Sequence, residues 1–383
     1  MRIALIRQRY NPYGGAERFV QQALSSLRAH EGLSLTLIAR HWDAQGAGVG
    51  ADMELCRPVY VGRTWRDWSF AKAACARVEA GNFDIVQSHE RIACCDIYRA
   101  GDGVHAQWLE NRARTLGTLG RLGQRLSPWH RYTLSAERRL FRSSRLKVVV
   151  CNSRMVANEV KTRFGVADER IRVIYNGVDL KRFHPGLRTL WRQTMLQRLG
   201  LPDDAKILLF LGSGFERKGA WRLLDAFAEL APHNRNVNLV IVGADRHIGR
   251  YRARCTRLGL EARVRVVGPQ DDAAPWYGMA DAYVLPTLYD PFPNAALEAM
   301  ASGLPVVTST QCGVAELLDE DAFGFACDAL DSRALVKHLC SLDSEACLAK
   351  GAIARSVAGR FPQEGMVEHL RRLYCELLAL PVS

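Results

Sequence analysis

The stretch that decides the fold spans residues 282–309 and reads AYVLPTLYDPFPNAALEAMASGLPVVTS. Its apolar ends, 282–286 and 305–309, are short and rich in β-branched or aromatic side chains, which favours buried strands. The alanine-rich part between them predicts a helix with Asn294 as its N-cap. A strand, a helix and a second strand in this order form one unit of a parallel α/β sheet.

The same alternation of short apolar runs and amphipathic segments continues toward both ends of the chain. It predicts an α/β protein with two doubly wound, Rossmann-like parallel sheets. The strands expected in the first sheet are 2–7, 33–39, 84–88, 147–152 and 171–175, with a further one near 96–99. Those expected in the second sheet are 207–212, 237–242, 264–268, 282–286, 305–309 and 323–327.

The chain has 383 residues, more than one hydrophobic core usually serves, so two domains are expected. The turn-forming sequence Asn176-Gly177-Val178-Asp179 lies between the two sets of strands. We therefore expect a first domain at 1–175 and a second at 176–362. The tail from Gln363 to Leu380 predicts one more amphipathic helix.

Two carboxylates flank the start of the predicted helix, Asp290 before it and Glu298 inside it. The free N–H groups at a helix start can hold anionic or hydroxyl-rich ligand atoms. This arrangement suits a sugar nucleotide, since one acid can reach the hexose while the other reaches the ribose diol, a bidentate donor to a carboxylate. The alternative is a solvated loop acid followed by an ordinary helix glutamate.

Glycine-containing turns follow the first strand of each predicted sheet. Gly14-Gly15 precedes one helix, and the loop 212–219, which contains Gly214, precedes another. Such turns let a phosphate approach bare backbone amides. Arg217 and Lys218 in the second loop supply adjacent cations that could stabilise a departing pyrophosphate; in most other contexts this dipeptide would be solvated surface.

Together these motifs resemble the retaining glycosyltransferases of family 4, whose signature is Glu-x7-Glu followed by Leu-Glu-Ala-x-Ala-x-Gly-x-Pro-Val. Two departures stand out: the first acid is Asp290, and Pro293 stands where the family usually has glycine. Proline has no N–H. The amides left to hold the donor hexose are therefore those of Phe292, Asn294 and Ala295.

The resemblance implies the GT-B architecture, in which two such domains face a cleft and the last helix crosses back to the first domain. Residues 363–383 would then join 1–175, the acceptor-binding domain, and 176–362 would bind the nucleotide sugar.

Further site residues are implied by the resemblance alone. Gly14, Gly15 and Glu17 would line the donor phosphates or the acceptor pocket, and Glu316 would lie near the nucleotide. In the segment after the strand near 96–99, we expect Asp102 to meet the acceptor hydroxyl and His105 the transferred sugar, unless both are structural. His89 and Glu90 are second-rank candidates.

No metal or other cofactor is expected. Asp319-Glu320-Asp321 contains an Asp-x-Asp pattern that binds metal in another class of glycosyltransferase, but here it trails a helix and is interpreted as a solvated turn. Arg217, Lys218 and helix dipoles would carry the charge compensation instead.

The formal net charge of +12 belongs wholly to the first half, where residues 1–175 hold 28 Lys and Arg against 16 Asp and Glu. Between Arg99 and Lys147, eleven basic residues face three acids, with Trp and Leu interleaved at roughly helical spacing. This predicts docking on an anionic membrane surface. The alternative is a solvated helix face packed on its own domain; no nucleic-acid-binding motif accompanies the charge.

Cysteine usage and hydropathy favour a cytoplasmic protein. The eleven cysteines include no Cys-x-x-Cys pair and are expected to be reduced, buried thiols. Neither a signal peptide nor a membrane span is indicated. The resemblance and the basic stretch then imply a place at the cytoplasmic face of the inner membrane.

The expected activity is metal-independent transfer of a hexose, with retention of configuration, from a nucleoside diphosphate sugar to a membrane glycolipid. UDP is favoured only by its frequency in the family, and the chain resembles family members that extend the lipopolysaccharide core. A sugar-nucleotide epimerase of the same fold and a non-catalytic nucleotide-sugar-binding protein are the alternatives.

Overall fold

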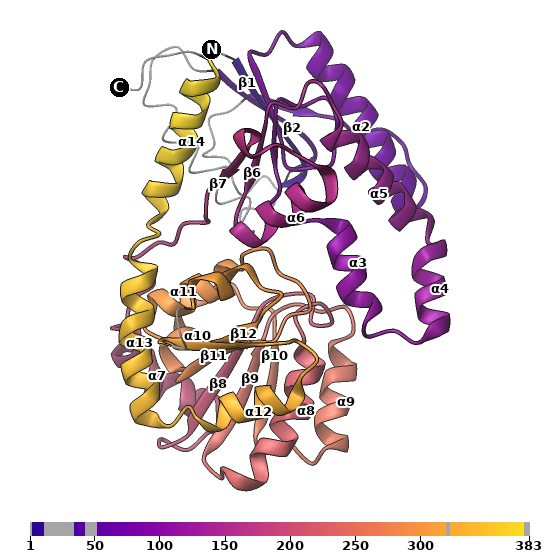
Figure 1. Cartoon of the computed structure of the whole chain (residues 1–383). Helices are drawn as coiled ribbons and strands as arrows, with labels where there is room; N and C mark the ends of the chain where they lie inside the picture. Colours follow the sequence, from indigo (N-terminus) through magenta and orange to yellow (C-terminus); the bar gives the residue numbers. More distant parts are fainter. Residues whose placement is uncertain (1, 11–33, 43–51, 319–321, 379–383) are drawn as a thin grey trace. The chain divides into compact units, whose positions relative to one another are not determined.

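A computed structural model describes residues 2–10, 34–42, 52–318 and 322–378. The chain forms two compact units, Met1–Asn176 with Glu364–Ser383, and Gly177–Gln363 (Figure 1). Each unit has its own parallel sheet, so the predicted α/β class with two Rossmann-like domains is confirmed.

The sheet of the first unit has the strand order β3-β2-β1-β4-β5-β6-β7, and every neighbouring pair is parallel. Its strands are β1 (Arg2–Tyr10), β2 (Ser34–Trp42), β3 (Asp52–Leu55), β4 (Ile85–Ser88), β5 (Ile97–Arg99), β6 (Val148–Cys151) and β7 (Ile171–Val173). Its helices within the described residues are α2 (Gly62–Ala80), α3 (His105–Ala113), α4 (Thr118–Leu126), α5 (Pro128–Phe141), α6 (Arg154–Phe164) and α14 (Gln363–Leu377). The short edge strand β3 was not predicted, because two of its four residues are acidic and none is buried.

The last helix, α14, completes the core of the first unit. Met366, Leu370 and Tyr374 are buried in one apolar cluster with β1, β2 and β4 side chains such as Leu5 and Ile85. The Tyr374 hydroxyl also donates to Gln87 Oε1 at 2.6 Å. The helix α14 therefore belongs to the first unit, although it follows the second unit in sequence (Figure 1).

The sheet of the second unit has the order β10-β9-β8-β11-β12-β13 and is also parallel. Its strands are β8 (Lys206–Leu211), β9 (Val237–Val242), β10 (Val264–Gly268), β11 (Ala282–Leu285), β12 (Val306–Ser309) and β13 (Gly324–Cys327). Its helices are α7 (Leu187–Leu199), α8 (Ala220–Leu230), α9 (Ile248–Arg257), α10 (Ala274–Met279), α11 (Asn294–Ala301), α12 (Ser332–Cys340) and α13 (Ser344–Ala358). The strand order turns between β8 and β11, so ligands of such a sheet are expected beyond the carboxyl ends of these two strands.

The start of α11 differs from the prediction by one residue. Pro293, in an extended conformation, occupies the N-cap position, and Asn294 is the first helical residue. The prediction of Asn294 as N-cap was wrong, because the fixed backbone of Pro293 already sets the turn into the helix.

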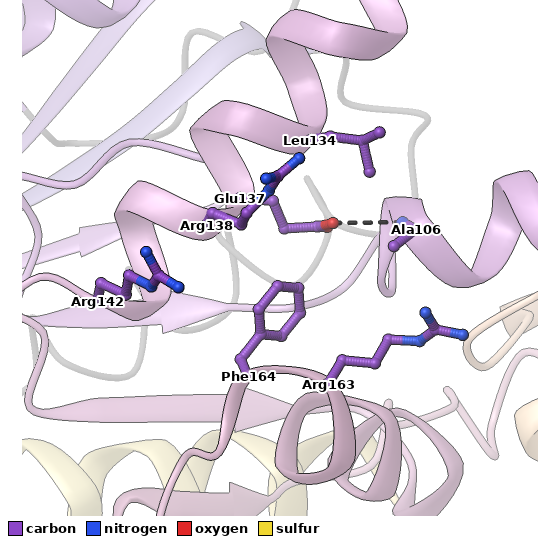
Figure 2. A pocket seen from close by; sticks show the side chains of 7 residues that line it. All are labelled: Ala106, Leu134, Glu137, Arg138, Arg142, Arg163 and Phe164. Carbon is purple, nitrogen blue, oxygen red and sulfur yellow. Dashed lines mark hydrogen bonds between the residues drawn. The ribbon is translucent and has the colours of Figure 1, made fainter. Parts of the chain in front are cut away.

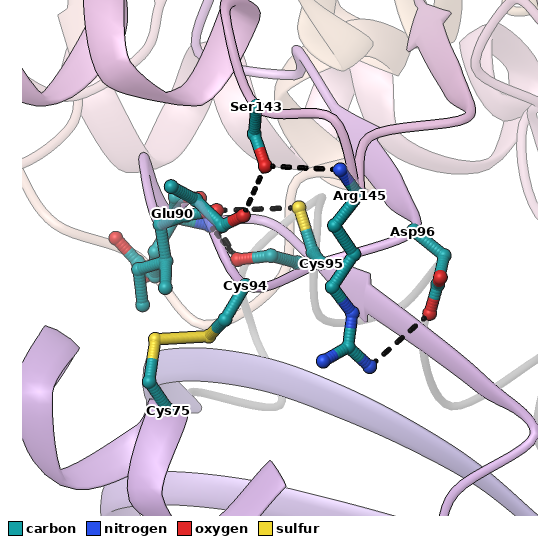
Figure 3. The surroundings of a disulfide bond; sticks show 10 residues. Cys75, Glu90, Cys94, Cys95, Asp96, Ser143 and Arg145 are labelled. Atoms are coloured by element: carbon teal, nitrogen blue, oxygen red, sulfur yellow. Dashed lines mark hydrogen bonds and ion pairs between the residues drawn. A yellow bond between two sulfur atoms is a disulfide. The ribbon is translucent and has the colours of Figure 1, made fainter. Parts of the chain in front are cut away.

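The prediction that all cysteines are reduced was also wrong. Cys75 on α2 and Cys94 in the segment between β4 and β5 form a disulfide, with their Cα atoms 5.8 Å apart (Figure 3). The packing of α2 brings together two thiols that are 19 residues apart in sequence. Among the remaining cysteines, Cys340 is exposed, Cys375 is half-buried and the others are buried.

Candidate active site

Three of the predicted residues meet in the second unit. Asp290 Oδ2 accepts a hydrogen bond from Lys218 Nζ at 2.9 Å and one from Arg217 Nη1 at 3.3 Å, and Arg217 Nη1 also donates to the Tyr289 carbonyl at 2.8 Å. The two cations follow β8 and the acid follows β11, adjacent strands of one parallel sheet. The cluster therefore lies beyond the carboxyl ends of these strands, where α/β sheets bind ligands.

This cluster keeps Asp290 ionised. Burial alone would raise the pKa of the Asp290 carboxyl, but Lys218 and Arg217 outweigh it and hold that pKa below its ordinary value. Lys218 is 8% exposed and fully engaged, whereas the Arg217 side chain keeps 37% of its surface exposed. Arg217 is thus the cation that can meet an incoming anion.

Glycines make room for this arrangement. The Lys218 side chain runs over Gly212, where an added Cβ would lie 2.7 Å from Lys218 Cδ. Gly219 adopts a φ of +79°, and a Cβ there would lie 1.9 Å from the Pro286 carbonyl oxygen. Gly214 faces open space instead, since a Cβ added there would meet no heavy atom within 4 Å, so its backbone is approachable.

The helix start beside Asp290 is also suited to an anion. α11 has no side-chain cap and no acid in its first turn, and Asn294 and Ala295 are half-buried, while Phe292 and Pro293 are buried. The positive end of the helix dipole thus lies close to Asp290 with no carboxylate in the first turn to offset it.

Glu298 contacts a residue that sequence analysis missed. Its Oε2 lies 2.9 Å from the hydroxyl of Tyr277 on α10, which also lies 3.0 Å from the Ala295 carbonyl oxygen. Tyr277 is 1% exposed, so this hydroxyl is held in place by packing. Glu316, in contrast, is exposed in a short 3₁₀ segment, Gly313–Leu317, whose first N–H donates to the Asp290 carbonyl at 2.9 Å.

In the first unit, Asp102 lies beside Arg7. Its Oδ2 is 3.7 Å from Arg7 Nη1, and its side chain is 59% exposed, so it is open to a ligand. Glu90 also lies near Arg7, at 3.6 Å, and accepts from the Gln8 N–H at 2.9 Å. Both acids therefore lie around one arginine in the second half of β1.

His105 is the first residue of α3 and is buried. Burial, with Arg91 and His130 nearby, lowers its pKa to about 3, so the ring is neutral at physiological pH. Its Nε2 lies 3.1 Å from His130 Nδ1, and its ring meets the Trp129 ring edge-on at 5.1 Å. It can exchange hydrogen bonds but does not supply a positive charge.

Two side chains that fix this region were not predicted. Glu137, 1% exposed, accepts from the His105 N–H at 2.7 Å and from Arg91 Nε at 3.0 Å. Asp67 accepts from the Trp129 indole at 2.7 Å. These pairs lie 32, 46 and 62 residues apart in sequence, and no local motif marks them.

His89, a second-rank candidate, is buried and pairs with Gln87 Nε2 at 3.0 Å. Burial lowers its pKa well below the ordinary value, with Arg99 and Arg7 adding to the effect.

Gly14, Gly15 and Glu17 lie outside the described residues, and so does Asp319-Glu320-Asp321. Within the described ranges, no group of three or more His, Cys, Asp or Glu side chains could hold a metal ion.

Two family models match the chain. Residues 205–344 match a model described as glycosyl transferases group 1, and residues 13–182 match one described as glycosyltransferase family 4. An uncharacterized glycosyltransferase of Methanocaldococcus jannaschii is 32% identical over 178 residues, which cover 46% of this chain and 45% of that protein. A D-inositol 3-phosphate glycosyltransferase of Thermobispora bispora is 27% identical over 325 residues, covering 79% of this chain and 73% of that protein.

This chain covers only part of the length of several relatives. The chain spans 45% of the archaeal protein and 58% of a D-inositol 3-phosphate glycosyltransferase from Jonesia denitrificans, about half the length of these curated relatives.

Solved structures with the same fold cover nearly the whole chain. WaaG, a glycosyltransferase involved in lipopolysaccharide biosynthesis, has a TM-score of 0.83 at 22% identity, covering 96% of this chain and 98% of that one. HepE of Anabaena in complex with UDP-glucose has a TM-score of 0.73 at 20% identity, covering 98% of this chain and 100% of that one. This likeness shows the GT-B fold, and the two family models, which together match most of the chain, show that it belongs to the family 4 glycosyltransferases.

Proposed function

We propose that this protein transfers a hexose from a nucleoside diphosphate sugar to an anionic glycolipid, with retention of configuration and without a metal ion. The observation that carries the proposal is the cluster of Arg217, Lys218 and Asp290 at the carboxyl edge of the second sheet. The partly exposed Arg217 and the starts of α8 and α11 are available there to stabilise the diphosphate as the glycosidic bond breaks.

The roles within this donor site follow from exposure and pairing. Arg217, partly exposed, would bind the diphosphate directly, and Lys218 would hold Asp290 ionised and oriented toward the hexose. Glu298 would bind the ribose diol, with Tyr277 fixing its carboxylate. In a front-face reaction the leaving phosphate oxygen helps to deprotonate the incoming hydroxyl, so this route needs no protein nucleophile.

UDP is the proposed nucleotide because HepE, which shares the fold, has been solved with UDP-glucose. The proposed acceptor class, a lipopolysaccharide core glycolipid, is supported by the likeness to WaaG and by the basic first unit. Relatives named D-inositol 3-phosphate glycosyltransferases favour a second candidate acceptor, a soluble phosphorylated polyol.

A peripheral contact with the membrane is proposed through α4. Leu119, Leu122 and Leu126 are 83%, 52% and 61% exposed, and none of the residues of α4 is buried. They recur at helical spacing beside Arg121 and Arg125, as in interfacial amphipathic helices. The alternative, a stretch packed on its own domain by its apolar residues, fits the half-buried Trp108, Trp129 and Tyr132 but not these three leucines. No helix in the described part of the chain is long and apolar enough to span a bilayer.

Replacing Leu119, Leu122 and Leu126 together by glutamine is expected to weaken binding to anionic vesicles at least tenfold, because three apolar side chains would no longer enter the interface. Vesicle sedimentation at low and high salt measures the effect. The control replaces Leu190 and Leu348, equally exposed leucines of the second unit, by glutamine. Equal binding by the α4 variant and the wild type would rule out this contact.

Replacing Tyr277 by phenylalanine is expected to weaken UDP binding about tenfold, because the Glu298 carboxylate loses its hydroxyl partner. Calorimetric titration with UDP measures the change in affinity. A uridine diphosphate whose ribose lacks both hydroxyls should bind the wild type and Tyr277→Phe with the same affinity. Tyr283→Phe is the matched control, since Tyr283 is also buried but donates to the Leu211 carbonyl. Unchanged UDP affinity in Tyr277→Phe would remove this residue from the site.

The function itself is tested with donor and acceptor in separate reactions. The protein is first screened for thermal stabilisation by a panel of nucleoside diphosphate sugars; a ligand at 100 times its dissociation constant stabilises by about 2.7 kcal/mol. The stabilising donor is then incubated alone, with phosphorylated glycolipid and with inositol phosphate, each with and without EDTA.

Transfer that requires an acceptor and persists in EDTA is the expected result. Isomerisation of the donor without an acceptor would indicate an epimerase, and binding without turnover a non-catalytic protein.

A further inference from the structure

A cavity distinct from the donor cluster lies wholly within the first unit. It has a volume of about 410 Å³, which falls in the range of small-molecule sites, and is bounded by α3, α5 and α6 (Figure 2). Three arginines line it, Arg138 on α5, Arg142 at the end of α5 and Arg163 on α6. Phe164, Leu134 and Ala106 supply apolar walls.

Two of the positive charges are uncompensated. Arg163 forms a bidentate ion pair with Glu110. Glu137, the acid in the cavity wall, accepts hydrogen bonds from Arg91 and from the first two N–H groups of α3. Arg138 and Arg142 are both exposed and make no ion pair within the described residues. They lie one turn apart on the same helix, where like charges repel. A dianion between them would relieve that repulsion.

The apolar walls limit the kind of anion. The Phe164 ring is stacked on Phe141 with centroids 4.3 Å apart, which holds one flat face in position at the cavity. A ligand with a phosphate at one end and a ring with C–H groups at the other matches both the arginine pair and the apolar wall. Guanidinium groups bind carboxylate and phosphate oxygens in bidentate fashion. A phosphate monoester, with three oxygens and a charge of about −1.5 to −2, can engage two arginines at once, whereas a neutral sugar offers no charge.

The cavity also adjoins the proposed acceptor side of the first unit. Ala106, in its wall, directly follows His105, and Asp102 lies three residues earlier in the turn that leads into α3. A sugar whose phosphate was held by α5 could thus present a neighbouring hydroxyl toward this turn.

We propose that the cavity is a subsite for a phosphorylated sugar, with the phosphate between Arg138 and Arg142 and the sugar ring against Phe164 and Leu134. The proposal rests on the proposed function only in taking this sugar to be part of the acceptor. Binding of the phosphorylated sugar itself is independent of donor binding and of turnover.

The experiment measures binding of glucose 6-phosphate, glucose and inorganic phosphate to the full chain by calorimetry. Glucose 6-phosphate is expected to bind saturably, inorganic phosphate more weakly, and glucose not at all. Arg138→Gln with Arg142→Gln should weaken glucose 6-phosphate binding about tenfold or more, because both charge-assisted contacts are lost.

The control carries Arg131→Gln with Arg139→Gln, which removes the same charge from the same helix at exposed positions that do not line the cavity. It should bind glucose 6-phosphate as the wild type does. Vesicles of phosphatidic acid test the other source of phosphate, a lipid headgroup.

Equal losses in the two double variants, no saturable binding by the wild type, or binding to the vesicles alone would each overturn the proposal. UDP titrations of the same proteins keep the two hypotheses apart. If glucose 6-phosphate binds through Arg138 and Arg142 while no donor binds, the subsite stands and the transferase assignment fails.

Discussion

Replacing Arg217 by alanine is expected to lower kcat by about 10²–10³-fold, the loss seen when one transition-state donor is removed. Arg217 is the partly exposed cation of the donor cluster, and within the described part of the chain its Nη1 donates to the Tyr289 carbonyl and to Asp290. Lys218 stays paired with Asp290 at 2.9 Å in this variant, so the buried acid is not left alone. The variant should therefore lose stabilisation of the charge that develops on the departing diphosphate, while the protein stays folded.

Steady-state kinetics with the donor found in the stability screen measures this effect, and thermal unfolding verifies the fold. Arg257→Ala is the control, because Arg257 is an exposed cation of α9 in the same unit, bonded to its own helix at the Ala253 carbonyl. Arg217→Lys should fall in between, since lysine keeps the charge but loses the planar fork. A folded Arg217→Ala protein with wild-type turnover would refute the role given to the cluster.

The second large effect concerns stability. Replacing Glu137 by alanine is expected to lower the free energy of unfolding by about 3–5 kcal/mol, because the change leaves Arg91 without its buried carboxylate. It also strips the first two N–H groups of α3 of their acceptor. Chemical denaturation followed by circular dichroism measures the change.

Two comparison variants separate a buried pair from an exposed one. Glu110→Ala, which breaks the exposed pair with Arg163, should cost less than about 1 kcal/mol. Arg91→Met combined with Glu137→Met should recover part of the loss, since apolar groups of similar volume replace both charges. If Glu137→Ala is no more harmful than Glu110→Ala, the buried pair does not fix the start of α3.

Sequence patterns predicted the sheets because most strands contain a short run of apolar residues. Val237–Val242, for example, is buried at every position, and the helices α8 to α11 separate the successive strands from β8 to β12. The edge strand Asp52–Leu55 escaped prediction since only its backbone pairing, not burial, makes it a strand. Pro293 shifted the start of α11 by one residue for a similar reason, because its backbone outweighed the capping preference of Asn294.

The donor cluster could be predicted from the sequence because each of its residues lies in a local motif. Arg217-Lys218 follows a glycine turn and Asp290 precedes a helix, and the parallel sheet then brings the two loops together. The contacts that support the site and the first unit could not be predicted in this way. Tyr277 and Glu298 are 21 residues apart and Cys75 and Cys94 are 19 apart, on elements that meet only after the helices pack.

The placement of α14 has a consequence for how the polypeptide emerges from the ribosome. The core beneath β1 and β2 contains Met366, Leu370 and Tyr374, so the surface that α14 buries stays uncovered until the whole intervening unit, Gly177–Gln363, has been translated. The later-made unit carries all of its own strands in one continuous segment and can close first. Nascent chains halted before residue 364 would therefore expose an apolar sheet surface and recruit chaperones, whereas release of the final helix would end that exposure.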